Sequence, residues 1–321
     1  MPIIQTTDLV KRYGDVEAVR GVSLEVNEGE SFGFLGPNGA GKTTTISILC
    51  TLLAPTSGRT EVNGYNCMNE PSKVRASIGL VFQETTLDNE LTAYENLKFH
   101  GYLYNMEKRM VEERIEEVMR VVMLHDRMGD AVKTFSGGMK RRLEIARGLL
   151  HRPRVLFLDE PTLGLDPQTR SHVWEFIERL KEEEGVTIFM TTHYMDEAER
   201  CDRVAIIDHG KIIACGTPEE LKSRVRGDAV HLETGDDGKA VLEMKERFGI
   251  EARRVRNGLV FNVEGGDAFI PRLFEKLSAE IRSVNVKRPS LDSVFLHLTG
   301  REIRESNNDN GGPAQAVRRR R

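Results

Sequence analysis

Hydrophobic and polar positions follow different patterns in different parts of the chain. Short, nearly continuous apolar runs rich in strand-forming residues, "GESFGFLG", "RVLFLDE" and "GVTIFMTTH", recur between stretches with helical spacing. Runs that are apolar on both faces and alternate with helices are typical of a mainly parallel sheet covered by helices. The run "RVAIIDHGKIIACG" has a polar centre and predicts a hairpin. We therefore expect a doubly wound α/β core.

The part of the chain from residue 87 to residue 150 follows the helical pattern alone. The stretch "ENLKFHGYLYNMEKRMVEERIEEVMRVVMLHDRM" has apolar residues at helical spacing and contains no strand-like run. Its methionine and aromatic residues are most simply interpreted as core packing. We expect a helical subdomain here, inserted into a first domain that covers residues 1–225.

A third pattern begins after "GTPEELKSRV". Between residues 226 and 300, the strand-like runs "AVHLET", "GLVFNV" and "IRSVNV" alternate with two helix-like stretches, which predicts a small α+β domain of the βαββαβ type. Residues 301–321 are polar and glycine-rich, which indicates a disordered tail. Its four terminal arginines are either a solvated charge run or a contact for anionic lipid.

Composition and charge narrow the classes of function. The chain has 321 residues and a formal net charge of -4, which argues against bulk binding of nucleic acid. Its four cysteines stand far apart without a CxxC pair, so neither a zinc ribbon nor a disulfide framework is expected. The N-terminal residues do not resemble a targeting peptide, and no apolar run approaches the roughly 20 residues of a membrane span.

The stretch "GPNGAGKTTT" lies between the strand-like "SFGFL" and the apolar, helix-like "ISILCTLL". This order of strand, loop and helix is the setting in which the pattern GxxxxGK[ST] binds nucleotide phosphates. Its glycines let backbone N–H groups point at phosphate oxygens, and the helix N-terminus favours negative charge. We expect Lys42 to reach the β- and γ-phosphates of ATP and Thr43 to bind Mg²⁺. The predicted phosphate loop comprises Gly36, Pro37, Asn38, Gly39, Ala40, Gly41, Lys42, Thr43 and Thr44.

A pair of carboxylates follows a second apolar run. In "RVLFLDEPTLGLD", four apolar residues end at Asp159, which places this carboxylate at the C-terminal edge of a buried strand. Ligands of open α/β sheets bind at such edges. We expect Asp159 to support the Mg²⁺ ion and Glu160 to orient or deprotonate the attacking water.

Several further segments, in the family's order, give residues 3–225 a resemblance to the nucleotide-binding subunit of an ATP-binding cassette (ABC) transporter. This resemblance implies an ABC-type P-loop NTPase fold. It also implies that Tyr13, in "VKRYGDVEAV", stacks on adenine, and that Gln83, in "GLVFQE", links Mg²⁺ or water to the helical subdomain. "FSGGM" matches the family's signature motif, Asp166 in "LGLD" its D-loop and His193 in "TTHYMDEAE" its switch histidine.

The helix predicted in "FSGGMKRRLEIARGLL" suggests a second anion site. It begins with a serine and two glycines, which leave N–H groups without partners and room for a ligand to approach. The resemblance implies that Ser136, Gly137 and Gly138 form this site and contact the γ-phosphate held by a second copy, so that ATP closes a homodimer. Phe135, Met139 and Leu163 depart from the residues common in the family. Because Lys42, Asp159, Glu160 and His193 are all present, we expect both sites of the homodimer to hydrolyse ATP.

The C-terminal stretch "KRPSLDSVFLHLTGRE" resembles the end of the ATPases of daunorubicin-resistance systems and related ABC-2 exporters. The resemblance implies an ATP-hydrolysing motor for the export of drugs or other hydrophobic compounds. It also implies a separate multi-spanning membrane subunit, contacted near Glu84 to Asn96, and a peripheral position at the cytoplasmic face of the cell membrane. No nucleic-acid partner is expected.

Two alternatives remain within the same superfamily. An importer ATPase more often carries a β-rich barrel as its C-terminal domain than an α+β unit. ABC proteins of translation or DNA maintenance usually have two cassettes, long coiled coils or zinc modules, and the sequence shows none of these. A single cassette favours transport, but it carries no record of the transported substrate.

Overall fold

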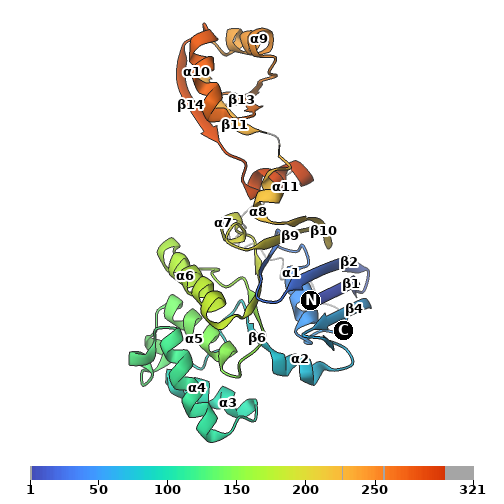
Figure 1. Cartoon of the computed structure of the whole chain (residues 1–321), viewed down its shortest axis with the longest axis vertical. Coiled ribbons are helices and arrows are strands. Elements are labelled where there is room, and N and C mark those ends of the chain that lie inside the picture. The colour runs from blue at the N-terminus through green and yellow to red at the C-terminus, as the bar shows by residue number, and fades with distance from the viewer. Residues whose placement is uncertain (1, 226, 256, 301–321) are drawn as a thin grey trace, which may run out of the picture.

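The computed structural model of the chain describes residues 2–225, 227–255 and 257–300. The predicted tail at 301–321 lies outside these residues. Figure 1 shows a larger part with two sheets and a group of helices, and a smaller C-terminal unit that extends from it beyond helices α8 (Pro218–Lys222) and α11 (Leu291–Thr299).

A six-stranded sheet forms the centre of the larger part, and it confirms the predicted α/β class. Its strands are parallel except for the last one in the sequence, which pairs antiparallel with the strand before it and forms the predicted hairpin. Every residue of its three middle strands is buried, which explains their nearly continuous apolar sequence. In spatial order the strands are β10 (Lys211–Gly216), β9 (Arg203–Asp208), β3 (Ser31–Leu35), β8 (Thr187–Thr192), β7 (Val155–Asp159) and β6 (Ile78–Val81).

An antiparallel sheet covers one side of this centre, with helix α1 (Lys42–Leu49) between the two layers. The sequence pattern does not predict this sheet, because its strands alternate buried and exposed residues and are interrupted by register shifts. Phe32, Phe157 and Phe189 of the central sheet pack with residues of this layer in one core. The strands are β2 (Val16–Asn27), β1 (Pro2–Tyr13), β4 (Ser57–Val62) and β5 (Tyr65–Asn66), and helix α2 (Pro71–Ser77) follows them.

Helices cover the other side of the central sheet. Leu156 and Leu158 of β7 share a second core with residues of these helices, among them Trp174. Helix α3 begins with a reciprocal pair of hydrogen bonds between Thr92 and Glu95, which fixes its first turn. The helical elements are α3 (Ala93–Leu103), α4 (Lys108–Val121), η1 (His125–Arg127), η2 (Val132–Thr134), α5 (Gly137–Leu149), α6 (Pro167–Glu184) and α7 (Met195–Ala198).

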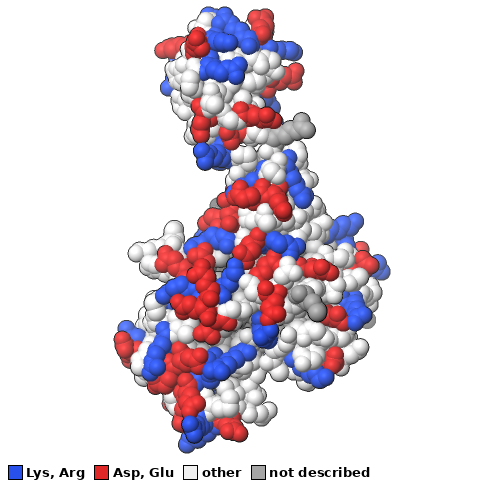
Figure 2. Space-filling model, viewed as in Figure 1, with Lys and Arg blue, Asp and Glu red and all other residues white. Residues whose placement is uncertain are grey.

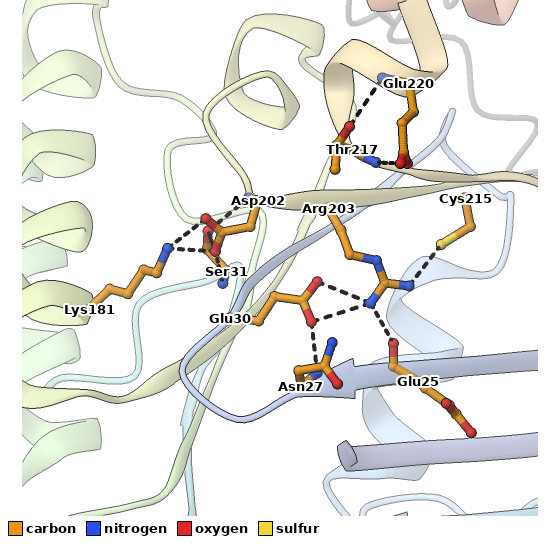
Figure 3. Close-up of polar contacts among 10 residues, drawn as sticks. All are labelled: Glu25, Asn27, Glu30, Ser31, Lys181, Asp202, Arg203, Cys215, Thr217 and Glu220. Atoms are coloured by element: carbon orange, nitrogen blue, oxygen red, sulfur yellow. Dashed lines mark hydrogen bonds and ion pairs between the residues drawn. The ribbon is translucent and has the colours of Figure 1, made fainter. Parts of the chain in front are cut away.

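A polar network joins the layers at the start of the central strands, opposite the edge where the predicted site residues lie (Figure 3). Asp202 accepts hydrogen bonds from the backbone N–H and the hydroxyl of Ser31 and pairs with Lys181 of α6. Arg203 pairs with Glu30 at 3.1 Å. These contacts fix the sheet's register at one edge.

The C-terminal unit has the predicted βαββαβ order. Its four antiparallel strands lie in the order β12 (Arg253–Val255), β13 (Gly258–Val263), β11 (Asp228–Thr234) and β14 (Ile281–Lys287), and its helices are α9 (Asp237–Phe248) and α10 (Gly266–Lys276). Helix α11 then returns to the larger part. There Leu291, Val294 and Phe295 are buried in the helical core, and the N–H of Leu291 donates to Glu199 Oε1 at 3.2 Å.

Candidate functional site

The loop between β3 and α1 has a backbone that only small residues allow. Gly39 and Gly41 have φ angles of 80° and 106°, in the region that favours glycine. A Cβ atom at Gly36 would lie 2.3 Å from the carbonyl oxygen of Ile207. The loop therefore closes tightly against β9, and it leads into the N-terminus of α1, where phosphate groups bind readily. Ala40 is buried in this loop, whereas Asn38, Gly39 and Thr43 are exposed and Pro37 and Thr44 are half-buried.

Lys42 folds back over this loop. Its Nζ donates hydrogen bonds to the carbonyl oxygens of Gly36, at 2.7 Å, and Pro37, at 3.2 Å, and lies 3.2 Å from Glu160 Oε1. Burial lowers the pKa of Lys42, and the Glu160 carboxylate opposes this shift. The ammonium group thus lies against the first residues of the loop, where it can contact the phosphates of a bound triphosphate.

Parallel pairing brings the predicted catalytic residues together. Leu35 pairs with Thr192, and Asp159 pairs with Thr191, so β3, β7 and β8 end at one edge of the sheet. The phosphate loop, Glu160 and His193 follow these three ends directly. Residues far apart in the sequence therefore share one site, as expected for an open α/β sheet.

The residues predicted to bind Mg²⁺ lie beside the loop. Thr43 Oγ1 is 3.5 Å from Asp159 Oδ1, and the Thr191 hydroxyl donates to the same carboxylate oxygen. Burial raises the pKa of Asp159, and the neighbouring Glu160 carboxylate adds to this effect. A bound cation would favour the ionised carboxylate and so lower the pKa of Asp159 again. The hydroxyl and carboxylate suit Mg²⁺, which takes few protein ligands besides water and substrate phosphates.

Glu160 occupies a strained backbone position. Its φ is 45°, a left-handed conformation that is unfavourable for a residue with a side chain. The backbone N–H of Glu160 donates to the hydroxyl of Thr191 at 3.0 Å, and its side chain lies 3.4 Å from His193 Nδ1. Burial alone would raise the pKa of Glu160, but His193 and Lys42 outweigh it and hold the pKa below its ordinary value. The carboxylate is therefore ionised and can accept a hydrogen bond from a water molecule.

Two predicted site residues lie at the margin of this cluster. Tyr13 ends β1 with an exposed ring, and Lys11 Nζ lies 5.2 Å from the centroid of this ring. Gln83 follows β6 by two residues and is exposed. The structure places both side chains at the surface, where a nucleotide or another ligand has access to them.

The signature residues Ser136, Gly137 and Gly138 lie at the start of α5, apart from this cluster. Ser136 caps the helix, because its hydroxyl accepts from the N–H of Met139 at 3.3 Å, so one of the N–H groups expected to be bare has a partner. A Cβ atom at Gly138 would lie 2.5 Å from Thr169 Cγ2. Thr169 in turn donates to Asp166, the N-cap of α6, which connects the signature and the D-loop.

Sequence reasoning missed three buried polar residues of this region. Thr191 fixes both Asp159 and Glu160, and Arg141 binds backbone oxygens on both sides of Glu160. Glu197, 1% exposed, accepts hydrogen bonds from the hydroxyls of Thr162 and Thr192. A sequence signal existed only for Glu197, a carboxylate four residues after the switch histidine.

A phosphate loop at the carboxyl edge of a parallel sheet, an acidic pair on a neighbouring strand and an inserted helical layer with a serine-capped helix define an ATP-binding cassette. Comparison with known families gives the same class. A family model described as ABC transporter matches residues 19–163, and one described as the C-terminal domain of DrrA1-3-like ATP-binding proteins matches residues 216–299.

Relatives cover nearly the whole chain. The linearmycin resistance ATP-binding protein LnrL of Bacillus subtilis (strain 168) is 40% identical over 94% of this chain and 100% of its own length. The daunorubicin/doxorubicin resistance ATP-binding protein DrrA of Streptomyces peucetius is 40% identical over 92% of both chains. The chain therefore belongs to the ATP-binding subunits of ABC transporters, whose activity is ATP hydrolysis coupled to transport.

Solved structures support the fold of the larger part. The cassette cbiO1 of Clostridium perfringens, part of the ABC transporter complex cbiONQ, has a TM-score of 0.65 and 29% identity, and the match covers 69% of this chain and 91% of that chain. The cassette MJ0796, a dimer bound to ADP and Pi in a post-hydrolysis state, has a TM-score of 0.60 and 28% identity, with coverage of 67% and 98%. Cassettes of this class thus bind nucleotide and act as dimers with membrane subunits.

Proposed function

We propose that this chain is the motor of an exporter of drugs or other hydrophobic compounds, and that Glu160 is its catalytic carboxylate. The observation that carries the proposal is the position of Glu160 at the sheet edge between Lys42 and His193. The names of the relatives support the cargo class, because they refer to linearmycin resistance, daunorubicin resistance and Nod factor export.

The chemistry assigned to the site follows from its charges. His193 and Lys42 hold the pKa of Glu160 below its ordinary value, so its carboxylate is ionised and can accept a hydrogen bond from the attacking water. In this proposal it also takes the proton of that water as the new bond to phosphorus forms. Lys42 stabilises the negative charge of the β- and γ-phosphates, and His193 holds the Glu160 side chain in place. Mg²⁺, held by Thr43 and Asp159 with Gln83 as an outer ligand, would neutralise phosphate charge when bound.

Two copies of the chain form the working unit in this proposal. Ser136, Gly137 and Gly138 of one copy contact the γ-phosphate bound by the phosphate loop of the other, Asp166 lies beside this contact, and Tyr13 stacks on adenine. These contacts exist only while the γ-phosphate bridges the copies, so hydrolysis removes the preference for the closed dimer. ATP therefore closes the homodimer, and loss of phosphate opens it.

A separate membrane subunit is required, and α3 offers a surface for it. In the described part of the chain, no helix is long and apolar enough to cross a membrane. Phe99, Tyr102 and Leu103 of α3 and Met110 of α4 are all more than 40% exposed, directly beyond the segment at 84–96. On the face shown in Figure 2, basic and acidic side chains are interspersed, as on a surface without a polyanion site. We place the chain at the cytoplasmic face of the membrane, bound through this apolar surface.

Copurification from membranes tests this assignment. The full chain carrying Glu160→Gln, loaded with ATP, should retain a multi-spanning membrane protein. Phe99→Asp in the same background should abolish this recovery, whereas Leu242→Asp, at an equally exposed position on α9, should not. Recovery of ribosomes or DNA, or recovery indifferent to Phe99→Asp, would contradict the transport assignment or the docking surface.

A further inference from the structure

Helix α5 carries a buried ion pair one turn beyond the signature residues. Arg141 and Glu144 are 6% and 1% exposed, and the Arg141 Nη1 atom lies 3.0 Å from Glu144 Oε2. A guanidinium has five N–H donors, and burial of such a group is costly unless the remaining donors also find acceptors. The acceptors in this case belong to two loops that follow the neighbouring parallel strands β6 and β7 at the carboxyl edge of the sheet.

The first loop is the turn that holds Glu160. Arg141 Nε donates to the carbonyl oxygen of Pro161 at 2.6 Å, and its Nη2 donates to those of Asp159 at 3.2 Å and Glu160 at 3.3 Å. Three successive carbonyl groups thus converge on one side chain. Because Glu160 has a left-handed φ of 45°, the turn persists only if surrounding contacts hold it, and Arg141 supplies three of them.

The second loop follows β6 and contains Gln83. The Nη1 atom of Arg141 donates to the carbonyl oxygen of Phe82, and Glu144 Oε1 accepts from the N–H of Thr86 at 2.8 Å. The ion pair therefore binds this loop on both sides of Gln83. A movement of the loop must act on the same guanidinium that holds the Glu160 turn.

We propose that Arg141 is a positioning residue for ATP hydrolysis: together with Glu144, it holds Glu160 in its strained turn and couples that turn to the loop around Gln83. The inference rests on the role proposed above for Glu160. The contacts of Arg141 described above are with Glu144 and with backbone carbonyl groups, so it acts through the backbone of the catalytic turn. A change at the loop around Gln83, such as docking of a membrane subunit, is thereby transmitted to the catalytic carboxylate.

The conservative variant Arg141→Lys tests the proposal in the full chain. A lysine keeps the charge opposite Glu144, but its single ammonium cannot bind three carbonyl groups in one plane. We expect kcat to fall by about 10- to 100-fold, the size of effect that small misplacements of a catalytic group produce, with ATP affinity changed by less than about threefold. A wild-type kcat in folded Arg141→Lys protein would overturn the proposal.

Arg114 offers a matched control. It is another buried arginine, 7% exposed, that donates to two carbonyl oxygens, those of Leu149 and Leu150, and pairs with Glu117. None of these partners belongs to the Glu160 turn or to the loop around Gln83. Arg114→Lys should therefore leave kcat unchanged within about twofold while it perturbs stability to a comparable degree. Equal losses of kcat in the two variants would show that Arg141 has only a structural role.

Two further measurements separate this inference from the proposed role of Glu160. In the Glu160→Gln background, Arg141→Lys should cause no additional loss of turnover, because residues that act as a unit are not additive. Hydrogen exchange should rise in peptides spanning 159–163 and 82–86 in Arg141→Lys but not in Arg114→Lys. Normal turnover of Glu160→Gln would reject the catalytic role of Glu160, whereas unchanged exchange in Arg141→Lys would reject the positioning role alone.

Discussion

The Nζ atom of Lys42 lies 3.2 Å from Oε1 of Glu160, and both side chains are buried at the carboxyl edge of the central sheet. The two opposite charges balance each other in this site, where an isolated buried charge would be costly. A triphosphate brings several negative charges to the same ammonium. In the proposed mechanism, ATP binding replaces part of the contact between Lys42 and Glu160 and leaves this carboxylate free to face the attacking water.

Replacement of Glu160 by glutamine separates binding from hydrolysis. Glu160→Gln removes the proton acceptor, so phosphate release should fall by a factor on the order of 10² or more. ATP should bind at least as tightly as it does to the native chain, because Lys42 no longer has to give up a contact with an ionised Glu160 when the phosphates bind. Size-exclusion chromatography in ATP should then show a trapped dimer.

A second buried carboxylate provides the control for this substitution. Glu243 accepts a hydrogen bond from the N–H of Ser278 at 2.7 Å in the C-terminal unit, remote from the phosphate loop. Glu243→Gln should keep native turnover and form no trapped dimer. Near-native turnover in Glu160→Gln would remove Glu160 from the mechanism.

We expect the ionised side chain of Asp159 to lower the stability of the folded chain although Mg²⁺-dependent hydrolysis requires it. Burial raises the pKa of this carboxyl, so its ionised form destabilises the folded chain at every pH above its unfolded pKa. Asp159→Asn should therefore raise Tm at neutral pH in the absence of Mg²⁺ by about 2 °C or more, and it should abolish Mg²⁺-dependent hydrolysis.

The pH dependence of this gain provides the check on its cause. The advantage of Asp159→Asn should be full at neutral pH and should vanish below the unfolded pKa of aspartate, where both chains are uncharged at this position. Thermal unfolding followed between acidic and neutral pH measures it. A gain in Tm that is independent of pH would contradict the assignment to ionisation.

The sequence predicted those features that depend on local pattern. Lys42, Asp159 and His193 follow apolar strands, and parallel pairing alone brings the ends of such strands to one edge. The roles of Thr191 and Arg141 depend on which strand and which loop lie beside them, and no local pattern contains that information. The cap at Ser136 has the same limit. The spacing predicts that a helix begins there, but the hydrogen bond from the N–H of Met139 to the Ser136 hydroxyl depends on the path of the chain before Ser136.

The antiparallel layer and the position of α11 show the same limit at a larger scale. β1 and β2 alternate polar and apolar residues with bulges, so their pattern is weaker than that of the buried strands. The pattern between residues 226 and 300 predicts two helices and assigns residues 291–299 to the C-terminal domain, so α11 is not predicted. In the structure this helix leaves the C-terminal unit and packs into the core of the cassette.

This return of α11 predicts a stability effect across the chain. Phe295 is 1% exposed in the same core as Trp174, the only tryptophan of the chain. Phe295→Ala should lower the free energy of unfolding of the cassette by about 3–5 kcal/mol, the usual cost of such a cavity. Urea unfolding followed by Trp174 fluorescence measures the change. Phe274→Ala, at an exposed position on α10, should shift the transition by less than about 0.5 kcal/mol.

The cap of α5 allows a test of the homodimer that leaves the helix intact. Ser136→Asp preserves a capping oxygen for the N–H of Met139, since aspartate caps helices as well as serine does. In the proposed dimer this carboxylate would face the γ-phosphate on the other copy. We expect normal ATP binding by the monomer and loss of the ATP-dependent dimer in sizing experiments.

Ser136→Arg, which blocks the same contact by its bulk, should behave alike although it removes the cap. Ser290→Asp changes the cap of α11, where the serine hydroxyl accepts from the N–H of Ser293, and it should leave dimer formation unaffected. Ser136→Asp keeps the helix cap and Ser136→Arg removes it, so loss of the dimer in both variants would be due to the proposed phosphate contact and not to the cap. Ser290→Asp does not disturb this contact. A normal ATP-dependent dimer in both of them would refute the assignment of this helix start to a nucleotide held by a second copy.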